Sequence, residues 1–199
     1  MNLCLSLPAE KTAVFYPILQ DGLNIRTDIH CSVKQFLQTT FHISRDYIES
    51  RIPTIMLNGK AVDDLNTAFL EENSTLALSS AMPGLAGATL RRRESLSPMR
   101  SGITYREQKK PEQTRRGTLK IKFFNVLIRE LGLKLLYQGI HMRGMDVAAL
   151  LRQLINSLKV DCAQIILDDQ EITMDELQKT KMFTQAGVEE VFFRVVGRI

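Results

Sequence analysis

The chain has 199 residues, of which 44% are hydrophobic and 24% charged, and its formal net charge is +4. This composition is typical of a globular protein and argues against disorder throughout the chain. No apolar run approaches the roughly 20 residues that span a bilayer, and the first eight residues lack the basic region of a signal peptide. We therefore expect a cytoplasmic protein that neither enters nor binds a membrane.

The first part of the chain predicts two strands, a helix and two further strands. These are expected at residues 13–19, 23–29, 33–41, 55–57 and 75–79. Asp21-Gly22 lies between two alternating runs, which indicates a hairpin, and Pro17 places the first strand at an edge or a bulge. Ser32 followed by Gln35 is the pattern of a capping box and opens the helix. The Asn58-Gly59 turn follows the third strand.

The last part of the chain predicts the same order of elements. Strands are expected at residues 119–125, 133–142, 163–167 and 191–196, with a main helix from 146 to 158 and a surface helix from 173 to 185. Asp146 is expected to cap the main helix, which carries apolar residues at the spacing of a buried stripe. Thr173 or Asp175 is expected to cap the surface helix, and Gly187 ends it. The sequence thus predicts two α+β domains, at 1–88 and 118–199.

A basic linker, residues 89–117, joins the two predicted domains. Between Arg91 and Gly117 nine basic residues face three Glu, a net charge of +6, so the rest of the chain sums to −2. The basic residues are Arg91, Arg92, Arg93, Arg100, Arg106, Lys109, Lys110, Arg115 and Arg116. They predict a solvated arm or one that binds an acidic protein partner. Nucleic-acid binding is the disfavoured alternative, because Tyr105 is the only aromatic residue available for stacking.

Several short motifs resemble the β-grasp (ubiquitin-like) family of sulfur carriers, which includes the molybdopterin synthase small subunit and the thiamine-pathway carrier. In the second half these are Lys120-Ile-Lys-Phe-Phe124, Ile128-Arg-Glu-Leu-Gly132 and Asp146-Val-Ala-Ala-Leu-Leu151. In the first half they are Leu57-Asn-Gly-Lys-Ala-Val62 and residues 76–87. The resemblance implies two β-grasp domains in tandem, each a mixed sheet packed on one main helix.

The carriers act through a C-terminal Gly-Gly that enters an adenylating enzyme and becomes a thiocarboxylate. This chain ends Val195-Val-Gly-Arg-Ile199 and has no such diglycine. Gly84 and Gly87 form the more similar exit in the first half, and Gly197 lies near the expected place in the second. Carrier activity would therefore require cleavage after Gly87. The resemblance supports the fold but leaves sulfur transfer as an alternative function.

No residue pattern indicates catalysis or a bound cofactor. Cys4, Cys31 and Cys162 are far apart and form no CxxC pair, so neither a disulfide framework nor a metal site is expected. Pairs of adjacent acids flank predicted turns and are interpreted as solvated. We therefore expect a non-enzymatic interaction or accessory subunit whose partner is another protein, such as a larger enzyme or an adenylating enzyme. The oligomeric state is left open.

Overall fold

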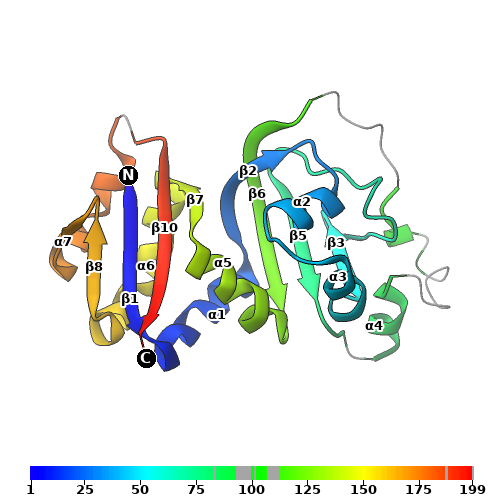
Figure 1. Ribbon diagram of the computed structural model, residues 1–199, viewed down its shortest axis with the longest axis horizontal. Coiled ribbons are helices and arrows are strands. Elements are labelled where there is room, and N and C mark those ends of the chain that lie inside the picture. Colours follow the sequence, from blue (N-terminus) through cyan, green and yellow to red (C-terminus); the bar gives the residue numbers. More distant parts are fainter. Residues whose placement is uncertain (83, 93–99, 101, 107–112, 187, 199) are drawn as a thin grey trace. The chain divides into compact units, whose positions relative to one another are not determined.

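The computed structural model describes residues 1–82, 84–92, 100, 102–106, 113–186 and 188–198. These residues form helices and two mixed β-sheets, an α+β fold (Figure 1). The chain divides into two units, one comprising Met1–Arg26 and Arg129–Ile199 and the other comprising Thr27–Ile128. Within the described ranges, no helix combines the length and apolar character required to cross a membrane.

The first unit contains a five-stranded sheet, called sheet A. Its strands in spatial order are β7 (Ile140–Arg143), β10 (Glu190–Arg198), β1 (Asn2–Pro8), β8 (Gln164–Leu167) and β9 (Gln170–Glu171). β1 and β10 run parallel, and the other neighbours run antiparallel. Leu3, Leu5 and Leu7 are buried on one face of β1, as strand alternation requires. That face packs on the apolar stripe of α6 (Gly144–Asp161), whose Val147, Leu151 and Leu158 are buried.

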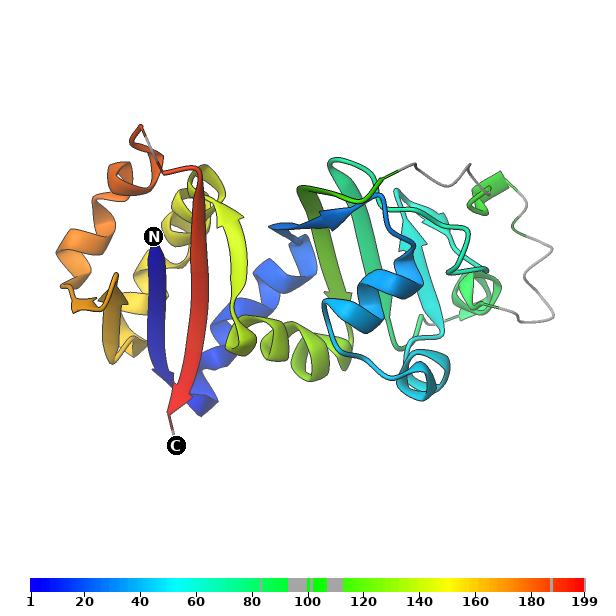
Figure 2. The same cartoon turned by 45° about the horizontal axis from the view of Figure 1, so that its top comes forward.

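Sheet B also has five strands and belongs to the second unit, apart from the first residues of its edge strand β2. In spatial order the strands are β2 (Leu23–Ile29), β6 (Arg115–Phe124), β5 (Ser74–Ser79), β3 (Thr54–Leu57) and β4 (Lys60–Ala61). β5 and β6 are parallel, whereas β3 is antiparallel to both β5 and β4. Phe41 contacts Phe36 and Phe123 with ring centroids 5.3 and 6.0 Å apart. The helices α2 (Val33–Thr39) and α3 (Arg45–Arg51) therefore cover one face of sheet B (Figure 2).

The remaining helical segments are short. They are η1 (Ala9–Phe15), α1 (Tyr16–Asp21), α4 (Gly84–Leu90), η3 (Ile128–Gly132), α5 (Leu133–Gln138), α7 (Met174–Gln178) and η4 (Thr180–Thr184). Two predicted helix starts are confirmed. The Ser32 hydroxyl accepts from the backbone N–H of Gln35 at 3.2 Å, and Thr173 forms a capping box with Glu176. The predicted surface helix, however, is divided into α7 and η4.

The predicted cap of the main helix needs correction. Arg143 occupies the N-cap position of α6 and makes no capping hydrogen bond with its side chain. Asp146 lies in the first turn, where its carboxylate accepts from the Arg143 guanidinium at 2.7 Å. An acidic residue in this turn still favours the helix, because it faces the positive end of the helix dipole.

One predicted strand is helical in the structure, and so is the first part of another, whose residues 140–142 do form a strand, in β7. Residues 13–19 fall in η1 and α1, and Leu133–Gln138 form α5. Pro17 lies in the first turn of α1, where its missing N–H leaves no hydrogen bond unmade. Gly22 (φ 107°) and Gly139 (φ 91°) end α1 and α5 in backbone conformations that favour glycine. The strand expected at residues 13–19, before β2, was therefore a wrong prediction. The N-terminal strand β1 was not predicted.

The first strand of each half of the chain, β1 or β6, lies in the sheet that the other half mainly forms. β6 lies in sheet B between β2 and β5, whereas β1 lies in sheet A between β10 and β8. The β-grasp order expected for the second half makes residues 119–125 and 133–142 neighbouring strands, and this is wrong, because β6 lies in sheet B and β7 in sheet A. For the same reason the two units differ in their bounds from the predicted domains at 1–88 and 118–199. Both opening strands alternate apolar and polar residues with the same period, so local pattern does not choose between the sheets.

Candidate functional site

The face of sheet B that points away from α2 holds a hollow of about 250 Å³. Two rows of paired residues cross it: Thr54, Ser79 and Phe124 form one row, and Met56, Ala77 and Lys122 form the other. Ala77 and Ser79 belong to the central strand β5, and their small side chains leave space between the larger residues of β3 and β6. Gly59, Thr75 and Met82 complete the lining. We call this feature the sheet B hollow.

The two hydroxyls of the first row differ in their hydrogen bonding. Ser79 Oγ donates to the Ala81 carbonyl at 2.9 Å and accepts from the Asn125 amide at 3.1 Å. Thr54 is 1% exposed, and its Oγ1 has no hydrogen-bond partner among the described residues. A buried hydroxyl without a partner is uncommon, because it has lost its water without replacement.

Among the residues that the structure describes, Lys122 is the only charged one that lines the sheet B hollow. Its side chain is partly exposed and makes no ion pair with any residue that the structure describes. Lys120 lies two residues earlier on β6 and therefore on the same face of the sheet. The sheet B hollow is thus apolar, with the positive charges of Lys120 and Lys122 on one side.

The linker contacts the second unit through Arg100. The Arg100 side chain is 1% exposed and donates to the Asp63 carboxylate at 2.5 Å. Thr104 bridges to Ala61 on the edge strand β4, and the backbone N–H of Tyr105 donates to the Ala61 carbonyl at 2.8 Å. Burial raises the pKa of the Tyr105 phenol, although a backbone hydrogen bond involving Phe69 opposes this. These contacts cover the outer edge of β4, which would otherwise expose unpaired backbone groups.

The residues of the predicted basic arm differ in their contacts. The Arg92 guanidinium donates to the carbonyls of Ile48 and Ile52, each at 3.0 Å, and so satisfies the end of α3. Arg115 lies 3.7 Å from Glu72 in an ion pair. Arg106 and Arg116 are exposed, and Arg91 is partly buried. Arg93, Lys109 and Lys110 lie outside the described residues.

The three glycines that were compared with the diglycine of the carriers lie in different structural environments. Gly84 (φ 75°) is exposed at the start of α4, whereas Gly87 is buried within this helix. A Cβ atom on Gly87 would collide with the Met82 carbonyl, which explains why glycine is needed there. Gly197 lies in β10, where an added Cβ atom would only come into van der Waals contact with Tyr137 and Ala9. Gly87 is therefore a packing residue of the folded chain.

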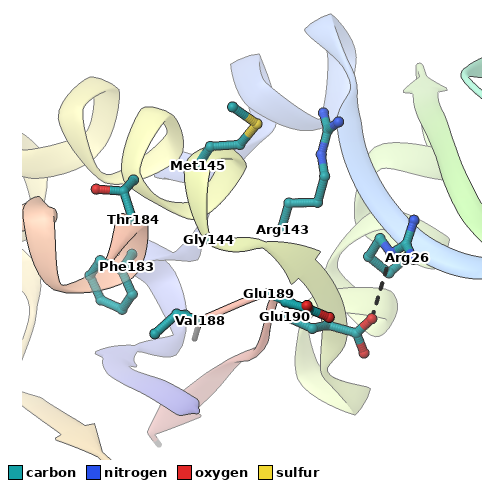
Figure 3. A pocket seen from close by; sticks show the side chains of 9 residues that line it. All are labelled: Arg26, Arg143, Gly144, Met145, Phe183, Thr184, Val188, Glu189 and Glu190. Carbon is teal, nitrogen blue, oxygen red and sulfur yellow. Dashed lines mark ion pairs between the residues drawn. The ribbon is translucent and has the colours of Figure 1, made fainter. Parts of the chain in front are cut away.

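A larger hollow, of about 510 Å³, lies at the start of α6 in the first unit (Figure 3). Phe183 and Val188 line it opposite Gly144, and a Cβ atom on Gly144 would collide with the Phe183 carbonyl. Of the four charged residues that are described in its lining, Arg26, Arg143 and Glu190 already form ion pairs. Arg26 lies 3.6 Å from Glu190, as the dashed line in Figure 3 marks, and Arg143 binds Asp146.

The cysteines are free thiols whose reactivity burial reduces. Burial raises the pKa of Cys4, Cys31 and Cys162. Cys31 is the one that is buried, at 5% exposed. Arg194 and Arg198 partly oppose this effect at Cys4. Over the described parts of the chain, no group of three His, Cys, Asp or Glu side chains is placed to hold a metal ion.

Sequence reasoning recognised the alternation of Lys120 and Lys122 with buried residues but did not identify the sheet B hollow. Thr54, Ala77 and Lys122 come together only through strand pairing, so no local motif marks them. No protein-family model, curated protein or solved structure matches the chain.

Proposed function

We propose that this chain is a non-enzymatic accessory protein that binds another protein through the outer face of sheet B. The observation that carries the proposal is the sheet B hollow, an apolar depression on the face opposite to the packed helices α2 and α3. Met56, Met82 and Phe124 supply its apolar walls. Partly exposed apolar depressions with a polar rim are typical of protein-binding surfaces.

The scaffold that we propose is β-grasp-like, with one strand exchanged. In sheet B the order strand, helix, strand, short strand, strand runs through β2, α2, β3, β4 and β5, and β6 supplies the remaining strand. This arrangement extends the resemblance to the sulfur carriers, whose family we propose as the relatives. The observed contacts support protein binding more directly than the two alternatives. Gly87 is buried in α4, and Arg92, Arg100 and Arg115 already bind groups of the same chain.

Site-specific photocrosslinking in cells that express the chain tests this proposal. A photoreactive residue at Lys120, on the proposed face, is expected to capture a defined protein, whereas the same residue at the exposed Lys159 of α6 is not. The captured protein is then purified and titrated with the wild type and with Ala77→Leu, which fills the sheet B hollow. Loss of binding in Ala77→Leu is expected. Equal capture from Lys120 and Lys159, or unchanged binding by a folded Ala77→Leu variant, would contradict the proposal.

A further inference from the structure

The volume of the sheet B hollow suits one side chain of a partner. At about 250 Å³ it is smaller than the roughly 300–1,000 Å³ of pockets that enclose drug-sized ligands. The walls from Met56, Met82 and Phe124 are apolar, and the methionines can adapt to the shape of an inserted group. Single aromatic or aliphatic anchors in such depressions commonly supply much of the energy of a protein interface.

The charge beside the hollow favours an acidic neighbour for that anchor. Lys122 is part of the lining, Lys120 lies on the same face, and no acidic residue of the described parts of the chain is in the lining. The two lysines would repel a basic segment and attract a carboxylate, which strengthens association and fixes its orientation.

Thr54 adds a second, independent indication. It lines the hollow, is 1% exposed, and carries the only buried hydroxyl of the described residues that lacks a hydrogen-bond partner. Ser79, the next residue in the same row, has both of its hydrogen bonds within the chain. A polar group of a bound segment would give the Thr54 hydroxyl the partner that the chain itself does not provide.

The geometry points to a partner segment that inserts one large apolar side chain into the sheet B hollow and places the carboxylate of an adjacent Asp or Glu beside Lys122. This inference rests on the proposed function and specifies the chemistry of the partner. The larger hollow of the first unit is less suited to such a segment, because Arg26 and Arg143 already form ion pairs with Glu190 and Asp146.

Blocked dipeptides test the inference on the full-length chain. The probes are acetyl-Phe-Asp-amide, acetyl-Phe-Asn-amide and acetyl-Ala-Asp-amide, added at millimolar concentration to protein with ¹³C-labelled methionine methyl groups. The methyl signals of Met56 and Met82 report on the hollow, and that of Met145, which is 59% exposed in the first unit, is the control. We expect Phe-Asp to shift Met56 and Met82 but not Met145. Phe-Asn should bind about threefold more weakly, and Ala-Asp should not bind measurably.

Variants of Lys122 separate charge from shape. Lys122→Gln is expected to remove the difference between Phe-Asp and Phe-Asn, and Lys122→Arg to retain it. Lys122 is partly exposed, so both variants should fold, and a thermal unfolding midpoint like that of the wild type verifies this. Absence of shifts at Met56 and Met82, or equal binding of Phe-Asp and Phe-Asn by the wild type, overturns the inference. If a crosslinked partner still loses binding in Ala77→Leu, the proposed function survives that result.

Discussion

The guanidinium of Arg100 donates to the carboxylate of Asp63 at 2.5 Å, although only 1% of the Arg100 side chain is exposed. Asp63 follows the edge strand β4, and Arg100 comes from the predicted linker, so the pair ties these two segments together. A buried guanidinium requires such a partner because it has given up its hydration.

Replacing Asp63 should therefore destabilise the protein. We expect Asp63→Ala to lower the free energy of unfolding by about 2–3 kcal/mol, at the low end for a broken buried pair because Asp63 is 39% exposed. Urea denaturation measures the change. Lys11→Ala, which removes the exposed pair with Asp161, is the control and should change stability by less than about 1 kcal/mol. If the two variants lose similar stability, the Asp63 pair does not hold the linker.

Two buried threonines should respond in opposite directions to the same substitution. Thr54→Val removes a hydroxyl without a partner and should leave stability unchanged or raise it by about 1 kcal/mol. Thr12 is similarly buried, but its hydroxyl donates to the Ala9 carbonyl at 2.7 Å, so Thr12→Val should cost about 1 kcal/mol. Thermal unfolding of both variants checks this. A loss of stability in Thr54→Val would show that its hydroxyl has a partner.

The exchange of β1 and β6 predicts that a divided chain reassembles. We expect residues 1–106 and 107–199, produced as two polypeptides in one cell, to co-purify as a complex. The first piece supplies β1 to sheet A, and the second supplies β6 to sheet B. Removing residues 2–8 from the first piece should weaken the complex. Two pieces that fold independently, with no association by size-exclusion chromatography, would disprove the exchange.

Gly144 should not tolerate alanine. At an exposed helical position, alanine in place of glycine normally stabilises by about 1 kcal/mol, but here the new Cβ atom would collide with the Phe183 carbonyl. We therefore expect Gly144→Ala to destabilise the protein. Gly102→Ala, where no atom of the described residues lies within 4 Å of the added carbon, is the matched control and should be close to neutral. Denaturation midpoints of the two variants decide the sign.

The three thiols, of which Cys31 is buried and Cys4 and Cys162 partly buried, predict that the stability of the fold depends on pH. Burial raises the pKa of Cys31, Cys4 and Cys162 above their ordinary value of 9.0, so the folded state holds these protons more tightly than the unfolded state. The resulting contribution to stability is present below about pH 9 and is lost as the pH rises through the folded pKa values. Thiol modification at pH 8 should accordingly be slower in the folded than in the urea-unfolded protein. Equal rates would mean that folding neither shields the thiols nor raises their pKa.

Elements with strong local signals were predicted from the sequence. Ser32 and Thr173 form the expected caps, and the stripe through Val147, Leu151 and Leu158 lies on the buried face of α6. Residues 13–19 and 133–138 were wrongly predicted as strands because short apolar runs fit both periods, and tertiary packing decides between them. The sheet B hollow could not be predicted, since its rows join residues up to 70 positions apart, Thr54 and Phe124 being the extremes.

The sequence by itself determined the starts of α2 and α7, the apolar stripe of α6 and the α+β class, because caps and apolar periodicity act over a few neighbouring residues. Only the tertiary structure decided which sheet receives β1 and which receives β6, and it thereby placed Lys122 beside Ala77 and Phe124 beside Ser79. The physical reason is that strands with the same alternation offer equivalent faces and backbone edges. Their pairing depends on the free energy of the whole fold and is not encoded in either strand alone.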